Sequence, residues 1–235
     1  MPAHVKITTV LAFIIVCVST PITQWRAFIA YFIAIYAVSL IAKIPTPTLL
    51  VRSLIEIPFI FFAILMPFFG TGERFEAGPF NLYRESLLAG AGIVVKGTLG
   101  VLSAVILSTS TTAREILRGL EKLHLPKLMV QIAAFMLRYV NVISDEMERM
   151  KVARESRGFI ATGLKDWRVI ATAASALFIR SYERGERVHL AMLSRGYAGI
   201  LPHDQSEGAP IKIWLQALVL PLFALSVLIS TIVIG

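Results

Sequence analysis

Five long apolar runs dominate this sequence and decide the solvent in which it can fold. They cover residues 7–22, 27–44, 53–69, 86–112 and 213–234. A hydrocarbon core of about 30 Å needs roughly 20 helical residues, with about 17 to 25 acceptable. The runs therefore predict five membrane-spanning helices, of which the first and third are short. No small-residue cleavage site follows the first run, so we expect a retained helix and not a signal peptide.

The composition agrees with a membrane protein and excludes several other classes. Of the 235 residues, 56% are apolar and 16% are charged, whereas soluble domains have about 45–50% apolar and about 25% charged residues. The single cysteine, Cys17, excludes a disulfide framework and a Cys-based structural zinc site. At this hydrophobicity, a disordered chain is excluded as well.

The charged residues divide the chain into three parts. Residues 113–210 hold 15 of the 23 Lys and Arg residues and 11 of the 15 acidic residues. We therefore expect an all-α membrane protein with a four-helix transmembrane block at residues 1–112, a helical cytoplasmic domain at 113–210 and a final transmembrane helix at 211–235. Because bases and acids are mixed, the net charge of +8 predicts no nucleic-acid partner.

Charges in the short loops predict the orientation. Lys6, Lys43, Arg52 and the block that begins at Arg114 lie on one side if the spans alternate, and cytoplasmic loops are the ones enriched in Lys and Arg. The N-terminus and the domain at residues 113–210 are thus predicted to be cytoplasmic, with the loop at residues 70–85 outside. Two further apolar stretches, 128–143 and 169–179, are predicted to be cytoplasmic or interfacial helices. Making both of them spans would place the six bases of residues 145–168 outside.

Two ionisable residues lie inside the predicted spans. Glu56 follows Arg52 by four residues, so the two are expected to pair near the cytoplasmic end. Lys96 lies about eleven residues into the fourth run, among Gly90, Gly92, Gly97 and Gly100. Small residues allow another helix to approach closely, so we expect Lys96 to face protein and to pair with a carboxylate or with backbone carbonyls.

An internal repeat is the most informative feature. Residues 148–159 read ERMKVARESRGF and residues 186–197 read ERVHLAMLSRGY, at a fixed offset of 38. Six pairs are identical: Glu148/Glu186, Arg149/Arg187, Ala153/Ala191, Ser156/Ser194, Arg157/Arg195 and Gly158/Gly196. Two copies without a third do not make a solenoid.

Each copy is typical of the end of a helix. Met150, Ala153 and Arg157 share a helical face, as do Val188, Ala191 and Arg195. A glycine then occupies the position at which a left-handed residue ends a helix. Capping alone does not require two matching copies, and two like motifs fit two like sockets on a twofold partner. The arginines would form charge-assisted pairs with carboxylates there.

The sequence resembles a known family at this point. The stretch from Arg114 to Phe159 is similar to the transmembrane (T) component of energy-coupling factor transporters, and FIRSYERGERVHLAMLSRGYAG, Phe178 to Gly199, is similar to its cobalt-type CbiQ branch. The family usually has Ala where this chain has Ser156 and Ser194. The resemblance implies a non-catalytic subunit of the prokaryotic cell membrane, without a cofactor or a metal site of its own.

The resemblance also implies partners and site residues. Two coupling helices would dock on a dimeric ABC-type ATPase and transmit ATP-driven motion to a membrane-embedded substrate-binding subunit, for cobalt, for nickel or for a vitamin such as biotin. The docking residues would be Ser156, Arg157, Gly158, Ser194, Arg195 and Gly196, supported by Ala153, Ala191, Arg149 and Arg187.

Other functions find less support in the sequence. A membrane enzyme would need a catalytic or metal-binding constellation, but the four histidines are scattered: His4, His124, His189 and His203. A self-sufficient transporter would be expected to show repeated or broken spans, whereas the only duplication here lies in the predicted cytoplasmic part.

Overall fold

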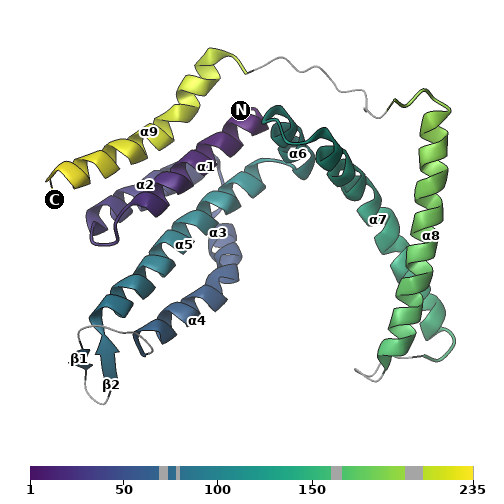
Figure 1. The fold of residues 1–235 in the computed structure, drawn as a ribbon, viewed down its shortest axis with the longest axis horizontal. Helices are drawn as coiled ribbons and strands as arrows, with labels where there is room; N and C mark the ends of the chain where they lie inside the picture. Colours follow the sequence, from purple (N-terminus) through teal and green to yellow (C-terminus); the bar gives the residue numbers. More distant parts are fainter. Residues whose placement is uncertain (69–73, 78–79, 160–165, 199–208, 235) are drawn as a thin grey trace. The chain divides into compact units, whose positions relative to one another are not determined.

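The computed structural model describes residues 1–68, 74–77, 80–159, 166–198 and 209–234. They form two compact units: Met1–Leu123 with Gly208–Gly235, and His124–Glu207 (Figure 1). Apart from one short hairpin, the regular structure that the model describes is helical. The predicted class, an all-α membrane protein, is confirmed.

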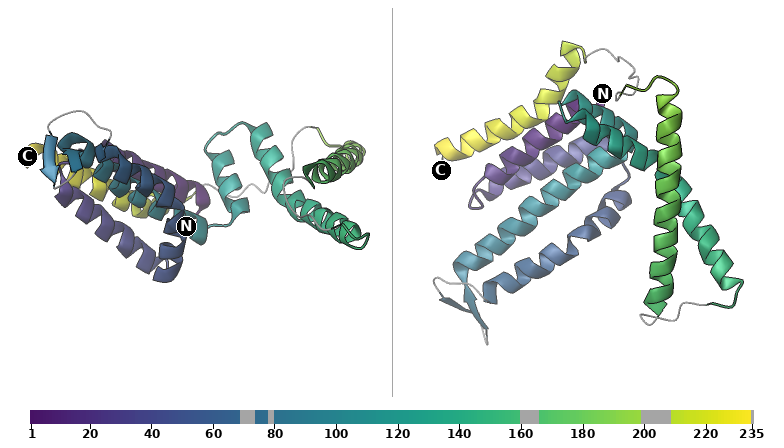
Figure 2. Two further views of the ribbon diagram at one scale, coloured as in Figure 1. Left: turned by 90° about the horizontal axis from the view of Figure 1, so that it is seen from below. Right: turned by 45° about the vertical axis from the view of Figure 1, so that its right-hand side comes forward.

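Four helices of the first unit lie alongside one another (Figures 1 and 2). They are α1 (Ala3–Ser19), α2 (Trp25–Ile41), α5 (Arg84–Ser110) and α9 (Ile211–Ile234). Their core contains the nearly fully buried Phe13, Tyr31 and Leu99. The Tyr31 hydroxyl lies 3.1 Å from Thr20 Oγ1 and donates to the carbonyl of Ala224 at 3.2 Å. This buried phenol is thus paired without water, as a core inside a bilayer requires.

An irregular helical segment packs against α5. It consists of α3 (Thr46–Ser53), the 3₁₀ turn η1 (Leu54–Glu56), α4 (Ile57–Leu65) and the 3₁₀ turn η2 (Met66–Phe68). A Cβ atom at Gly90 of α5 would lie 2.7 Å from the carbonyl oxygen of Ala63. The predicted close approach of another helix is confirmed at Gly90. At Gly92 and Gly97 the close contacts are with the side chains of Ile22 and Glu56, and at Gly100 the prediction is wrong, because nothing lies within 4 Å.

The predicted Arg52–Glu56 pair is wrong. Glu56 is only 3% exposed and accepts a hydrogen bond from Thr98 Oγ1 at 3.0 Å, while Arg52 donates to Thr109 Oγ1 at 2.9 Å. The 3₁₀ turn η1 lies between the two charged residues. Both side chains bond to α5 instead of to each other, Glu56 with Thr98 and Arg52 with Thr109.

Part of the predicted loop at residues 70–85 is regular. Strands β1 (Arg74–Ala77) and β2 (Phe80–Tyr83) pair antiparallel, with Arg74 opposite Tyr83 and Ala77 opposite Phe80. The sequence did not predict this hairpin, because four residues are too few to display a twofold period.

Helix α6 (Ala113–Lys122) packs on α1 and belongs to the first unit. It begins with a capping box, in which the Thr112 amide donates to Glu115 Oε2 at 2.8 Å. The hydrogen bonds from the Thr112 amide and hydroxyl lower the pKa of Glu115 below its ordinary value. Gly119 lies against α1, since a Cβ there would lie 2.9 Å from the His4 amide nitrogen. The second compact unit accordingly begins at His124, eleven residues after the predicted coupling domain.

The second unit consists of α7 (Lys127–Glu155) and α8 (Trp167–Leu193), which run antiparallel. No residue of α8 is buried within the described structure. Large apolar side chains such as Met136, Phe178 and Leu190 are exposed. Exposed apolar surface of this extent is typical of a surface that contacts a partner or a membrane.

Four helical segments of the described chain are long and apolar enough to cross a membrane: Thr46–Leu65, Glu85–Ser110, Lys127–Glu155 and Ile211–Val233. Helices α1 and α2 are apolar but shorter, at 17 residues each. These helices are those of a multi-pass membrane protein. Helix α7 is among the four, whereas the loop charges place its residues 128–143 on the cytoplasmic side. The sidedness of the chain stays a prediction.

Candidate docking site

The two copies of the repeat form the ends of α7 and α8. The last residues of these helices, Glu155 and Leu193, are related by the offset of 38, and the first residues agree to within two positions. The two helices are thus of nearly equal length, and the repeated sequence covers the end of each of them.

The backbone has the same conformation at both ends. Gly158 has φ +78° and Gly196 has φ +80°. The Phe159 amide donates to the Arg154 carbonyl at 3.1 Å, and the Tyr197 amide donates to the Met192 carbonyl at 3.0 Å. With the bonds from the two glycine amides at 2.9 and 3.0 Å, each end is a Schellman motif. The predicted glycine-terminated helix ends are confirmed.

The side chains of the two ends also match. Ser156 and Ser194 donate to the carbonyls of Ala153 and Ala191, at 3.1 and 3.0 Å. Both hydroxyls are thus bound within their own helix. Arg157 and Arg195, one residue further on, are exposed.

The structure keeps the two ends apart. Because the helices are antiparallel, the ends lie at opposite ends of the hairpin, about one helix length or roughly 40 Å from each other. A partner that binds both must present two separate sockets.

Each end borders a groove between the helices. The first groove is lined by Met150, Ala153 and Arg157 of α7 together with residues of the first half of α8. The second groove is lined by Val188, Ala191 and Arg195 of α8 together with residues of the first half of α7. The prediction that each set shares a helical face is confirmed.

The supporting arginines flank the ends. Arg149 lines the first groove, and both Arg149 and its repeat counterpart Arg187 are exposed. Among the described residues, the salt bridges are Lys151–Glu148 and Arg180–Glu146. Arg157 and Arg195 thus form no salt bridge with an acidic residue in the described part of this chain.

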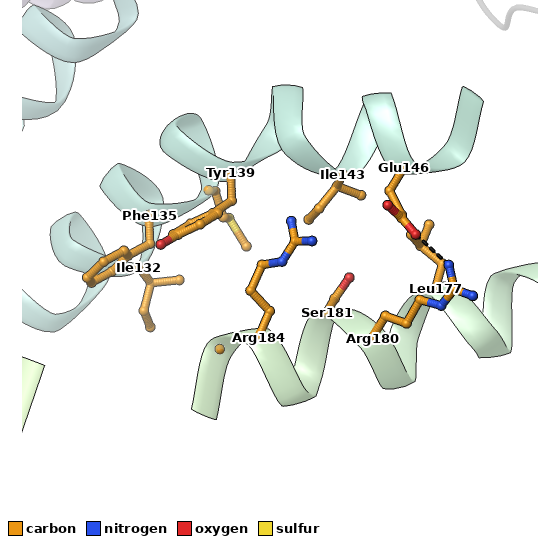
Figure 3. Close-up of a pocket in the computed structure, with 11 residues that line it drawn as sticks. Ile132, Phe135, Tyr139, Ile143, Glu146, Leu177, Arg180, Ser181 and Arg184 are labelled. Carbon is orange, nitrogen blue, oxygen red and sulfur yellow. Dashed lines mark hydrogen bonds and ion pairs between the residues drawn. The ribbon is translucent and has the colours of Figure 1, made fainter. Parts of the chain in front are cut away.

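A pocket of about 340 Å³ lies where α7 and α8 cross (Figure 3). Ile132, Phe135 and Tyr139 of α7 face Ser181 and Arg184 of α8 across it (Figure 3). At one end of the pocket, Arg180 donates to Glu146. A second link joins the helices where Tyr197 donates to Gln131 Oε1 at 3.2 Å. The sequence predicted neither link, because partners 34 and 66 residues apart leave no local pattern.

Lys96 lies in the first unit, far along the chain from the docking residues. Its Nζ donates to the carbonyl oxygen of Val18 at 2.7 Å. Val18 is in the last turn of α1, where carbonyls have no partner within the helix. Lys96 therefore caps α1. Any further role for it stays a prediction.

We expect Lys96→Met to lower the stability of the first unit by about 1 kcal/mol, because it removes a cation and a hydrogen bond from a helix C-terminus. Lys96→Arg, which keeps the charge, is the matched control. Thermal unfolding of the purified protein in detergent measures both. An unchanged midpoint for Lys96→Met would show that the cap is unimportant.

Within the described residues, no group of three His, Cys, Asp or Glu side chains could hold a metal ion.

Several known proteins with similar sequences are named as transport proteins. A family model described as "Cobalt transport protein", CbiQ, matches residues 1–207. A fused cobalt transport protein named CbiMQ, of Methanocorpusculum labreanum, is 29% identical over 216 residues, which are 88% of this chain and 36% of that protein.

Two further relatives extend the comparison. The energy-coupling factor transporter transmembrane protein EcfT of Listeria innocua is 28% identical over 213 residues, 83% of this chain and 78% of that protein. The cobalt transport protein CbiQ of Rhodobacter capsulatus is 27% identical over 109 residues, 46% of this chain and 45% of that protein. The matched part thus spans about half or less of the length of several curated relatives.

Proposed function

This chain belongs to the CbiQ family of cobalt transport proteins, and we propose that it is the transmembrane coupling subunit of an energy-coupling factor importer. In this role it carries ATP-driven motion from a dimeric ABC-type ATPase to a membrane-embedded substrate-binding subunit. The chain itself catalyses no reaction. The names of its relatives, transmembrane proteins of energy-coupling factor transporters and cobalt transport proteins, support this role.

The observation that carries the proposal is the pair of equivalent helix ends. Arg157 and Arg195 lie at equivalent positions of two helix ends. Each follows a serine and precedes a glycine with positive φ, and both arginines are exposed. A dimeric ATPase offers two equivalent sockets related by a twofold axis. Because this chain has two equivalent helix ends, one copy of it can occupy both sockets.

The chemistry of the ends suits carboxylate partners. An arginine guanidinium forms bidentate, charge-assisted hydrogen bonds with Asp and Glu. The Ser hydroxyls and the Ala residues beside them present little bulk, so a socket can approach the backbone closely. We assign docking to Arg157 and Arg195 and support to Arg149 and Arg187.

The exposed apolar side chains of α7 and α8 support a second partner. Trp167, Phe178 and Leu190 are all more than half exposed in the isolated chain. We assign part of this surface to the membrane-embedded substrate-binding subunit and part to the bilayer interface. The N-terminus and the second unit then lie on the cytoplasmic side of a prokaryotic cell membrane.

We propose cobalt as the transported substrate, in line with the family description. Nickel or a vitamin such as biotin would require the same coupling subunit with another substrate-binding partner. Identification of the membrane protein that co-purifies with this chain distinguishes the three.

Co-purification also tests the proposed role itself. The tagged chain, extracted from its native membrane in mild detergent, should bring down an ATPase pair. A preparation that contains this chain alone and turns over a substrate would favour a membrane enzyme instead.

The glycines at the helix ends provide a further prediction. Gly158→Ala with Gly196→Ala places a Cβ on two residues with positive φ, which costs about 1–2 kcal/mol at each, although nothing lies within 4 Å of either position. We expect the affinity for the ATPase pair to fall by roughly thirtyfold or more, with a matching loss of recovery. Gly185→Ala, at a helical glycine of α8 that also has nothing within 4 Å, is the control and should recover as much ATPase as wild type. Equal recovery with the double variant, the control and wild type would show that the left-handed ends are not required.

A further inference from the structure

The two grooves beside the docking ends are related by the repeat but differ in size. The first groove has a volume of about 700 Å³ and the second about 360 Å³. Ala173 and Ala176 of α8 line the first groove, whereas the residues 38 positions before them, Phe135 and Arg138 of α7, line the second groove. The small side chains leave the first groove open. Its volume is in the range of pockets that bind small ligands.

The first groove is also the more cationic of the two. Arg149, Arg154, Arg157 and Arg180 line it, and its only acidic lining residue, Glu146, pairs with Arg180. The Nη1 atom of Arg154 is buried and has no hydrogen-bond partner among the described residues. The repeat counterpart of Arg154 in the second groove is Met192. ATPase docking does not require an arginine at position 154, because the second helix end has a methionine at the equivalent position.

A buried guanidinium nitrogen without a partner among the described residues suits an anion in this groove. Leaving such a group unpaired is costly, and several guanidinium groups around one space suit an anion with several oxygen atoms, such as phosphate. Val169 at the start of α8 lines the groove, and Trp167 and Ile170 beside it are exposed. Tryptophan and apolar side chains next to cationic ones are typical of the membrane interface, where the phosphates are those of lipids.

We propose that the first groove binds the phosphate of an anionic phospholipid headgroup, with Arg154 at its centre and Arg149 beside it. The acyl chains of the lipid would contact apolar side chains next to the groove. A smaller hollow of about 260 Å³, which shares Met150, Arg154 and Ala173 with the first groove, is lined largely by apolar residues. The lipid site shares Arg149 and Arg157 with the first docking end, but its central residue, Arg154, is not a docking residue. Substitution of Arg154 therefore tests lipid binding separately from ATPase docking.

The test measures lipid-dependent thermal stability of the purified full-length chain in detergent. Micelles are supplemented with phosphatidylglycerol, with phosphatidylcholine or, separately, with inorganic phosphate. A ligand that binds only the folded protein raises the unfolding midpoint. We expect phosphatidylglycerol to raise the midpoint and the other two additions to leave it almost unchanged.

Arg154→Met should weaken phosphatidylglycerol binding roughly ten- to hundredfold, the usual effect of losing a hydrogen bond to a charged group. It introduces the residue found at the counterpart position, Met192. Arg184→Met, in the crossing pocket, is the matched control and should retain binding. Ala173→Phe copies Phe135 of the second groove, fills the site without changing its charge, and should abolish binding even if Arg154→Met does not fold.

Three results would overturn the proposal. If phosphatidylcholine raises the unfolding midpoint as much as phosphatidylglycerol does, the groove does not recognise the negative charge of the headgroup. An equal rise with inorganic phosphate would make the ligand a soluble anion instead of a lipid. An undiminished response to phosphatidylglycerol in Arg154→Met or Ala173→Phe would place any lipid site outside the first groove.

Discussion

Replacing Arg157 and Arg195 together by glutamate should abolish recovery of the ATPase pair with this chain, and with it transport. Each substitution removes a charge-assisted pair and places a carboxylate opposite a carboxylate. Truncating one partner of a buried charged pair at an interface costs about 2–5 kcal/mol, and charge reversal costs more. At two docking ends, the loss exceeds roughly a thousandfold in affinity. The measurement is ATPase co-purified per chain, together with uptake of the substrate.

Folding and insertion must be shown to survive the double substitution. Both arginines are exposed at helix ends, so we expect normal insertion and an unchanged elution volume in size-exclusion chromatography. Glu183→Lys with Asp145→Lys is a control whose charge change is equal in size and opposite in sign, at exposed positions of the same two helices outside the docking ends. It should retain the ATPases. Normal complex recovery and uptake in the Arg157→Glu, Arg195→Glu protein would refute docking through these ends.

Gly90→Val should cause the largest loss of stability in the first unit. A Cβ at this position would lie 2.7 Å from the backbone carbonyl oxygen of Ala63, a group that cannot rotate away as a side chain can. Helices α4 and α5 must therefore separate. Overpacking of this kind costs about 1–3 kcal/mol. Thermal unfolding in detergent, followed by the loss of the monodisperse elution peak, measures the effect.

Gly100→Val is the matched control for Gly90→Val. Gly100 lies in the same helix, and nothing lies within 4 Å of a Cβ placed there. Because valine and glycine differ by only about 0.5 kcal/mol in helix propensity, the midpoint should hardly change. Equal effects of the two substitutions would mean that Gly90 matters through helix propensity and not through the packing of α4.

Features with a local cause could be predicted from the sequence. The apolar runs predicted a helical membrane protein, and the glycine after each Ser-Arg pair predicted the left-handed helix ends at Gly158 and Gly196. Both depend on hydropathy or on the conformational freedom of one residue. The repeat also predicted that two distant helix ends are alike, since like sequences have like local physics.

Features that depend on contacts between distant residues could not be predicted in the same way. Arg52 and Glu56 bond to Thr109 and Thr98 of α5 instead of to each other, and partners 57 and 42 residues away leave no local pattern. The first groove exists because Ala173 and Ala176 of α8 lie opposite the arginines of α7. The repeat does not predict that the first groove is larger than the second, because the docking residues are duplicated and the groove residues opposite them are not.

Native mass spectrometry of the complex purified through this chain tests the central claim most directly. Two equivalent docking ends on one polypeptide predict a mass that contains one copy of this chain, two ATPase subunits and one membrane-embedded substrate-binding subunit. A single substitution, Arg157→Glu or Arg195→Glu, should weaken retention of the ATPase pair, and the double substitution should remove both subunits. A complex with one ATPase subunit per chain, or with none, would contradict docking at two equivalent ends.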